Sequence, residues 1–154
     1  MIGLNLVLTI YLADRLSKFI VMKKLFFGES IPVLKSFFHI TLVGNTGAAF
    51  GMFKNFPYFF LIISIVAVFL LIFLLILKNH KFRFLERISL CFVLAGTLGN
   101  LTDRLQFGFV VDFIDFRIWP VFNLADSFIT AGAFLLAWSV LFRSQTVGKG
   151  QNYA

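Results

Sequence analysis

The sequence predicts an all-α membrane protein with four transmembrane helices and a small extracytoplasmic β element between the first two. Of its 154 residues, 60% are hydrophobic and the mean hydropathy is +0.94, whereas soluble domains are about 45–50% apolar. Apolar runs recur along the chain, and a helix of about 20 residues crosses the hydrocarbon core of a bilayer. The net charge is +7, with the basic residues at the ends of these runs. Membrane lipids, not nucleic acid, are therefore the expected partners of this charge.

The first predicted span, residues 2–22, contains charged residues. Asp14, Arg15 and Lys18 interrupt its apolar run and no small-residue cleavage site follows, so we interpret it as a retained helix and not as a signal peptide. Asp14 and Lys18 are four residues apart, a spacing that places them on one face of a helix where they can pair. Such a pair would lower the cost of insertion and turn this face toward the interior of the bundle.

The connector of residues 23–55 is long for a hairpin. Apolar and polar residues alternate around residues 37–43, and several glycines and one proline punctuate the segment. This pattern favours short strands joined by turns, lying on the outer surface of the membrane.

Three further spans are predicted at residues 56–77, 84–105 and 121–142. The first is free of charged residues, and the second has glycines in its centre, where small residues allow helices to approach closely in lipid. The third is uncharged except for Asp126. One compact membrane domain covering residues 1–154 is therefore expected, because the chain is too short for two.

Four spans place both termini on the same side of the membrane. The connector of residues 78–87 has four basic residues and one acidic residue, so the positive-inside rule assigns it, the tail of residues 144–154 and the N-terminus to the cytoplasm. Lys23 and Lys24 argue for the opposite orientation, but the short connector is the denser signal. The segment between the third and fourth spans then faces outward.

Four of the seven acidic residues crowd into this outward-facing part of the chain: Asp103, Asp112, Asp115 and Asp126. A carboxylate in hydrocarbon costs roughly 2.5–3.5 kcal/mol, so several at one depth indicate a function. Two aspartates held close together share one proton, and such a pair can activate water and protonate a substrate without a cofactor. Asp112 follows the third span and Asp126 opens the fourth, so both are expected at one interface, within reach of water.

Structural interpretations of the same residues remain open. Asp103 could pair with the adjacent Arg104 at the end of the third span, and Asp115 could be solvated in a loop. Asp112 and Asp126 could cap helices, although Asn123 suits a cap better and leaves Asp126 one turn inside.

Functions other than hydrolysis are also compatible with this composition. Proton- or cation-coupled transport through the aspartates is the main alternative to hydrolysis. The two histidines, His39 and His80, are interpreted as surface residues, and the sequence has no zinc motif and no phosphate loop. No metal or cofactor is therefore predicted.

Five short motifs resemble those of the lipoprotein signal peptidase family, the type II signal peptidases of bacteria. In chain order they are D-R-L-S-K at 14–18, N-T-G-A-A-F-G at 45–51, G-N-L-T-D-R at 99–104, V-V-D-F-I at 110–114 and F-N-L-A-D-S at 122–127. The resemblance rests on the five together, in this order, with this pattern of spans and this chain length.

This resemblance implies a four-helix aspartyl endopeptidase of the bacterial plasma membrane, with residues 23–55 forming a β-cradle on the outer face. Its substrates would be diacylglyceryl-modified prolipoproteins, cut just before the lipidated cysteine. The implied catalytic pair is Asp112 and Asp126. The other motif residues would support substrate, dyad or fold: Asn45, Asn100 and Arg104 would hold the substrate backbone, Asn123 would orient the pair, Gly47 and Ala125 would support the site, and Asp14, Lys18 and Asp103 would stabilise the fold.

Overall fold

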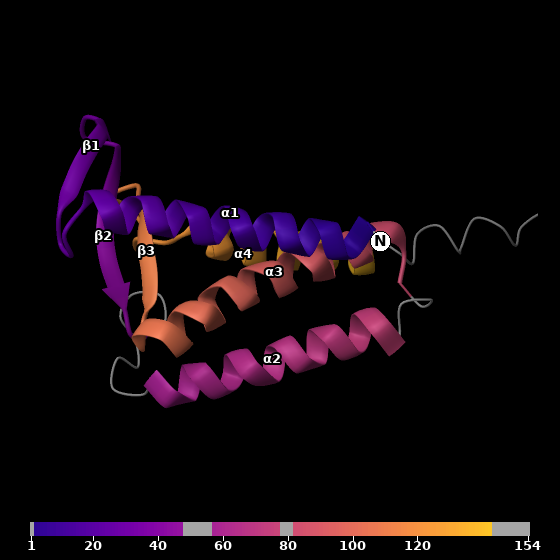
Figure 1. Ribbon diagram of the computed structural model, residues 1–154. Helices are drawn as coiled ribbons and strands as arrows, with labels where there is room; N and C mark the ends of the chain where they lie inside the picture. Colours follow the sequence, from indigo (N-terminus) through magenta and orange to yellow (C-terminus); the bar gives the residue numbers. More distant parts are fainter. Residues whose placement is uncertain (1, 48–56, 78–81, 143–154) are drawn as a thin grey trace, which may run out of the picture.

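Four helices and a small sheet make up the computed structural model, which describes residues 2–47, 57–77 and 82–142. In chain order the elements are α1 (Ile2–Lys24), β1 (Ser30–Leu34), β2 (Phe38–Asn45), α2 (Pro57–Leu77), α3 (Phe84–Phe107), β3 (Val110–Asp115) and α4 (Leu124–Leu141). The helices run side by side and the sheet lies across one end of the bundle, opposite the N-terminus (Figure 1).

Three of these helices are long and apolar enough to cross a membrane: Tyr58–Leu77 of α2, Phe84–Phe107 of α3 and Leu124–Leu141 of α4. They correspond to three of the predicted spans, with α3 continuing past residue 105 and α4 beginning after residue 121. With 23 residues, α1 is long enough to span, but its charged residues set it apart from the other three. Its role as a fourth span therefore stays a prediction.

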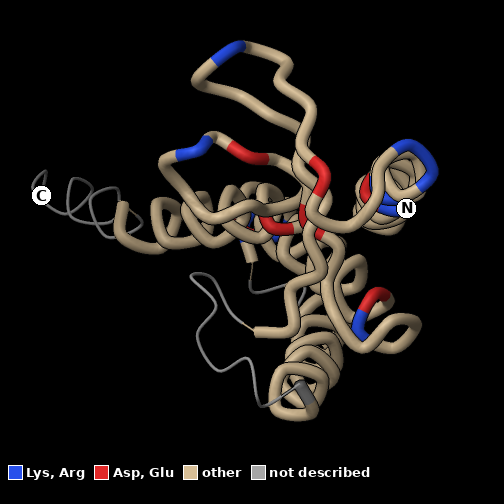
Figure 2. Tube along the Cα trace, turned by 90° about the vertical axis from the view of Figure 1, so that its left-hand side faces the viewer, with Lys and Arg blue, Asp and Glu red and all other residues tan. Residues whose placement is uncertain are grey.

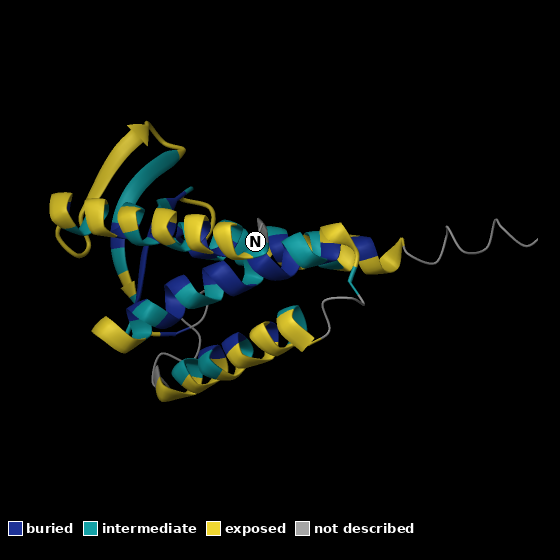
Figure 3. Cartoon of the chain, turned by 45° about the vertical axis from the view of Figure 1, so that its right-hand side comes forward, coloured by how far each residue is buried: buried dark blue, intermediate teal, exposed yellow. Residues whose placement is uncertain are grey.

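Burial follows the arrangement expected of a bundle in lipid. Large apolar side chains on α1, α2 and α4 are exposed, among them Leu4, Phe69 and Phe134. In Figure 3 the exposed positions lie on the outward sides of the helices, and the buried positions follow α3. α3 is therefore the central helix, and the outer surface of the other helices is suited to acyl chains.

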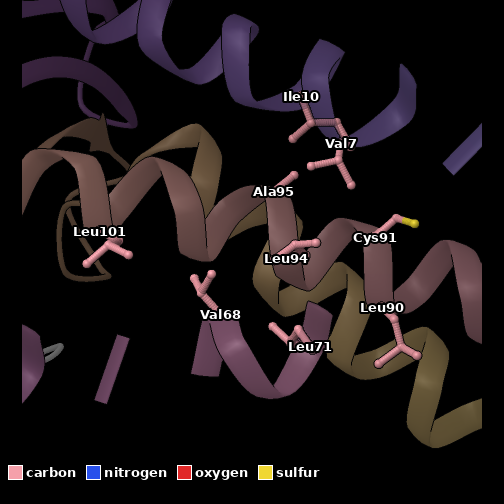
Figure 4. Close-up of a cluster of buried hydrophobic side chains, with 9 residues drawn as sticks. All are labelled: Val7, Ile10, Val68, Leu71, Leu90, Cys91, Leu94, Ala95 and Leu101. Atoms are coloured by element: carbon pink, nitrogen blue, oxygen red, sulfur yellow. The ribbon is translucent and has the colours of Figure 1, made fainter. Parts of the chain in front are cut away.

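The apolar core joins α1 and α2 to α3. Val7 and Ile10 from α1 and Val68 and Leu71 from α2 point toward α3 (Figure 4), where they pack against its buried side chains: Leu90, Cys91, Leu94, Ala95 and Leu101.

On its other side α3 lies very close to α4. A Cβ atom at Gly96 would be 2.3 Å from the carbonyl oxygen of Ala125, so only glycine permits this approach. The contact brings the start of α4, with Asp126, against the C-terminal half of α3.

The sheet is antiparallel in the order β1-β2-β3. Its first two strands come from the connector in which strands were predicted, but β3 comes from the segment between α3 and α4, where none was predicted. The pairs Val43–Asp112 and Asn45–Val110 lie opposite each other in β2 and β3. A small cluster of Leu25, Leu42 and Val111 seats the sheet on the end of α1. The sheet thus brings one end of the long connector alongside Asp112.

The interpretation of Asp115 as a solvated loop residue is wrong. Asp115 ends β3 and is only 5% exposed. Its carboxylate accepts hydrogen bonds from Thr41 Oγ1 at 2.7 Å and from the backbone N–H of Arg117 at 2.8 Å. Burial alone would raise the pKa of Asp115, but these hydrogen bonds outweigh it and hold the pKa below its usual value. Thr41 also contacts Ser30, which lies 3.1 Å from His39 Nδ1. Asp115 therefore belongs to a polar row that holds the strands together.

Candidate active site

The two aspartates predicted as a pair are brought together by the turn between β3 and α4. Phe122 pairs with Ile114, since each donates its backbone N–H to the other's carbonyl, at 3.0 and 2.7 Å. The chain therefore doubles back and sets Asn123 beside Asp112. Asn123 then caps α4 and Asp126 occupies its first turn, as the sequence predicted for both residues.

Asn123 links the two aspartates directly. Its Nδ2 donates to Asp112 Oδ1 at 2.7 Å, and its Oδ1 accepts the backbone N–H of Asp126 at 2.8 Å. Its own backbone N–H donates to Asp126 Oδ2 at 3.4 Å. Asn123 is completely buried, so this one residue fixes the positions of both carboxylates.

Asp112 has the environment of a carboxyl group that can hold a proton near neutral pH. It is 1% exposed, and Asn45 Nδ2 donates to its Oδ2 at 2.9 Å. Burial first, and then the negative charge of Asp126, raises the pKa of Asp112 from 3.8 to about 7. The hydrogen bonds from Asn45 and Asn123 act in the opposite direction and offset only part of this rise.

Gly47 orients Asn45. The Gly47 backbone N–H donates to Asn45 Oδ1 at 3.0 Å, so the amide of Asn45 must turn its NH₂ group toward Asp112. The sequence placed Gly47 among the supporting residues, and this hydrogen bond is one physical basis for such a role. Residues 48–51 of the same motif lie outside the described residues.

Asp126 is held by the third asparagine of the site. Asn100 Nδ2 donates to Asp126 Oδ1 at 2.6 Å, and Asn100 Oδ1 accepts from Asn123 Nδ2 at 3.0 Å. The positive end of the α4 dipole also favours a carboxylate in its first turn. Three asparagines from β2, α3 and the start of α4 therefore surround the pair with amide donors.

A cluster of four charges lies behind these asparagines, at the contact of α1 with α3. Lys18 Nζ lies 2.9 Å from Asp14 Oδ2 and 2.7 Å from Asp103 Oδ2, and Arg15 also pairs with Asp103. The predicted Asp14–Lys18 pair is confirmed. Asp103, however, pairs with these two cations of α1, whereas the sequence had suggested Arg104, because α1 crosses α3 on the face that Asp103 occupies.

The two anions of this cluster also tie the site to the helices. Asp14 Oδ1 accepts the backbone N–H of Ala125 at 2.9 Å, and Asp103 Oδ2 accepts that of Val111 at 3.1 Å. Ala125 is completely buried, and only a small side chain fits beside Gly99 there. Acidic positions gather where the sheet meets the helix ends (Figure 2), so charges distant in sequence converge on one region.

A cavity of about 940 Å³ opens beside the two aspartates. Its polar wall includes Asn45, Asn100 and Arg104 as well as the pair. Its apolar wall comes from the turn before α4, from α2 and from the N-terminal part of α4: Phe60, Phe116, Trp119, Pro120, Val121, Phe122, Ile129, Ala131 and Phe134. The cavity therefore combines a carboxylate pair at one end with a hydrophobic surface that follows a membrane helix.

Arg104 supplies the positive charge of this cavity. Its Nη1 donates to Ser64 Oγ of α2 at 3.1 Å, and its guanidinium lies 5.8 Å from the centre of the Phe60 ring. Sequence reasoning missed both partners, although Ser64 is the one serine in an otherwise apolar run. It also missed the aromatic wall, because the sequence has 23 phenylalanines and nothing distinguishes those that line a cavity.

The part of the chain that the structure describes contains no candidate metal site. Within residues 2–47, 57–77 and 82–142, no three His, Cys, Asp or Glu side chains come together in a group that could hold a metal ion. The polar groups that line the described cavity include two carboxyl groups, amides and a guanidinium.

Comparisons with known proteins show the family of this chain. The family model of signal peptidase (SPase) II matches residues 6–142. The lipoprotein signal peptidase of Moorella thermoacetica is 45% identical over 150 residues, which cover 95% of this chain and 97% of that protein. The lipoprotein signal peptidase of Halothermothrix orenii is 46% identical over 145 residues, covering 92% and 96% respectively.

A solved structure shares the fold. It is that of a bacterial membrane enzyme determined by the in meso method at 2.3 Å resolution, with a TM-score of 0.84 and 31% identity over 99% of this chain and 93% of that one. A second such structure, at 1.9 Å resolution, has a TM-score of 0.80 and 33% identity. Since the family model and the relatives span nearly the whole chain, this protein belongs to the signal peptidase II family and is a membrane peptidase.

Proposed function

We propose that this protein is an aspartyl endopeptidase that removes the signal peptide from diacylglyceryl-modified prolipoproteins, with Asp112 and Asp126 as its catalytic residues. The observation that carries the proposal is the linkage of both carboxylates to Asn123 at one end of a half-apolar cavity. The scissile bond would be the one just before the lipidated cysteine, and neither a metal nor a cofactor would take part.

Hydrolysis by this pair requires one proton shared between two carboxyl groups. Water placed between them would lose a proton to the ionised aspartate while its oxygen attacks the carbonyl carbon, and the protonated aspartate would donate to the carbonyl oxygen. The proton taken from water would then pass to the leaving amine as the C–N bond breaks. A pKa of about 7 for Asp112 suits the protonated role near neutral pH, although the two groups titrate as a unit.

The remaining polar groups of the site would hold the reactants. Asn45, Asn100 and Asn123 donate to the carboxylates, so the pair is oriented before substrate arrives. Arg104 lines the cavity without a carboxylate within ion-pair distance among the described residues. Its guanidinium would bind carbonyl oxygens of the substrate backbone.

The apolar wall explains why a lipidated substrate suits such a site. Each buried CH₂ of an acyl chain contributes roughly 0.8 kcal/mol to membrane partitioning, so two chains would fix the modified cysteine at a set depth. The anchored substrate would then hold its scissile bond next to the two aspartates, and such proximity lowers the activation barrier substantially. This requires the dyad near the outer leaflet of the bacterial plasma membrane, with four spans and both termini in the cytoplasm.

The experiment is cleavage of a diacylglyceryl-modified prolipoprotein by the purified protein in detergent. Asp112→Asn and Asp126→Asn are each expected to lose cleavage by about 10²-fold or more, the smaller end of what acid–base catalysis supplies, while the protein stays folded. Asp115→Asn is the matched control, because it removes a buried carboxylate of the same strand whose partners are Thr41 and Arg117.

Two outcomes would contradict the proposal. Retained cleavage in either dyad variant would remove that aspartate from the mechanism. Equal cleavage of the precursor with and without its lipid would remove the diacylglyceryl group from recognition.

A further inference from the structure

Lys18 is completely buried, and its ammonium group meets three oxygen atoms. Two are carboxylate oxygens, Asp14 Oδ2 at 2.9 Å and Asp103 Oδ2 at 2.7 Å. The third is the amide oxygen of Asn100, at 3.1 Å. An ammonium group has three donors and no acceptor, so every donor of Lys18 has a partner and one of them reaches the site.

This contact decides how the Asn100 amide is oriented. The two ends of an asparagine amide have nearly the same shape, and hydrogen-bond partners determine which is which. Because Lys18 can only donate, the atom facing it must be Oδ1. The Asn100 NH₂ group then has to face the other way, where it donates to Asp126 Oδ1 at 2.6 Å.

The same amide oxygen reaches the second aspartate. Asn100 Oδ1 also accepts from Asn123 Nδ2, and this nitrogen donates to Asp112 Oδ1 at 2.7 Å. From this geometry we infer that Lys18 is a positioning residue of the proposed dyad, acting on Asp126 through Asn100 and on Asp112 through Asn100 and Asn123. This inference rests on the proposed function and assigns to Lys18 more than stabilisation of the fold.

Pairing with the two anions does not account for every contact of Lys18, because its third donor goes to Asn100. Asp103 already has Arg15 as a cationic partner, and Asp14 already accepts a backbone N–H. Replacing a buried ion pair by apolar side chains is often neutral or stabilising. A fourth charge at this place is therefore better explained by its effect on the neighbouring amide and on the pair.

The charge of Lys18 also acts on the protonation of the pair. The charged groups around Lys18 and the pair are Asp14 and Arg15 on α1, Asp103 and Arg104 on α3, Asp112 on β3 and Asp126 on α4. Burial first, then the charge of Asp126, raises the pKa of Asp112, and the positive charge of Lys18 lowers it. Removing that charge should raise the pKa of Asp112, and the pH profile of cleavage should move to higher pH.

The test compares Lys18→Met with Arg15→Met. Methionine keeps the length of the side chain but can neither donate nor carry charge. Each variant removes one cation from Asp103, but only Lys18 contacts Asn100. Per folded protein, Lys18→Met should lower kcat at least about tenfold with little change in KM, as expected for an interaction that serves the transition state. Its alkaline limb should lie at higher pH, whereas Arg15→Met should keep the wild-type kcat and profile.

A charge-balanced variant guards against loss of folding. Asp14→Asn keeps the acceptor for Ala125, so the double variant Asp14→Asn/Lys18→Met loses one anion and one cation together. It should show the same loss of kcat and the same shift in profile relative to Asp14→Asn alone.

If neither lysine variant folds, a measurement on the wild-type protein can still test the role of Lys18. Buried ammonium protons exchange slowly, so the Lys18 signal can be followed in ¹⁵N-lysine-labelled protein. It should shift as the pair takes up a proton, and a signal unchanged over that pH range would overturn the inference.

The outcome also separates this inference from the proposed function. If Asp112→Asn is inactive but Lys18→Met or the double variant keeps its kcat and profile, Lys18 is structural and the inference is wrong, while the dyad stands. If Asp112→Asn still cleaves, the proposed function fails whatever Lys18 does.

Discussion

At the scale of single residues, the site is controlled by amide groups. Asn45, Asn100 and Asn123 each donate to a carboxylate, and each amide is oriented by a partner of its own: the Gly47 N–H, Lys18 or the Asp126 N–H. Amide donors favour the ionised form of a carboxyl group, whereas burial favours the protonated form. The protonation of the pair therefore depends on a balance between these two effects.

This balance can be shifted at Asn45, whose hydrogen bond lowers the pKa of Asp112. In Asn45→Ala that bond is lost, so the pKa of Asp112 should rise above about 7, and the alkaline limb of the cleavage profile, where Asp112 loses its proton, should move to higher pH. Cleavage rate against pH is the measurement. Ser30→Ala, which removes a hydroxyl of the same sheet without contact to the pair, should leave the profile in place, and an unshifted Asn45→Ala profile would contradict this account.

At the scale of elements, the sequence predicted the helices well and the third strand not at all. The charge-free apolar run of α2 has the length and composition of a membrane span. Its predicted range, residues 56–77, therefore agrees with the observed helix to within one residue. The segment V-V-D-F-I-D has two carboxylates in six residues, which conceals its strand character, and its pairing with β2 is a long-range contact that no local pattern reveals. Asp115 was therefore misplaced, and the polar row across the sheet was missed.

The close contact of α3 and α4 is the element-scale feature most open to a test. A Cβ atom at Gly96 would meet the backbone oxygen of Ala125 at 2.3 Å, which cannot move without moving α4. Gly96→Ala should lower the stability by about 1–3 kcal/mol, the usual cost of overpacking. Cleavage should fall as well, because Asn100 lies one turn further along α3 and would be displaced from Asp126.

Thermal unfolding in detergent measures the first effect and the cleavage assay the second. Gly3→Ala is the matched control, since its Cβ would meet only the thiol of Cys91, at 3.3 Å. A Gly96→Ala protein as stable as this control would show that α4 can shift at little cost.

At the scale of the whole molecule, the sheet and the dyad share one end of the bundle, and the N-terminus lies at the other (Figure 1). A substrate anchored by lipid in the outer leaflet can meet the dyad only if the sheet end faces outward. The composition of the connector at residues 78–87 predicts that orientation through the positive-inside rule, while Lys23 and Lys24 at the end of α1 oppose it. The orientation of the sheet end in the membrane is therefore the feature that most needs an experimental test.

Labelling with a membrane-impermeant thiol reagent measures this orientation. In a Cys91→Ser background, Lys35→Cys in the turn between β1 and β2 should react in intact cells, because that turn is exposed at the sheet end. Lys149→Cys in the tail should react only after the membrane is permeabilised. The three helices α2, α3 and α4 separate the two positions whether or not α1 spans the membrane, so labelling of both in intact cells would contradict these three spans. Labelling of the tail alone would place the dyad at the cytoplasmic face, where a prolipoprotein lipidated in the outer leaflet could not reach it.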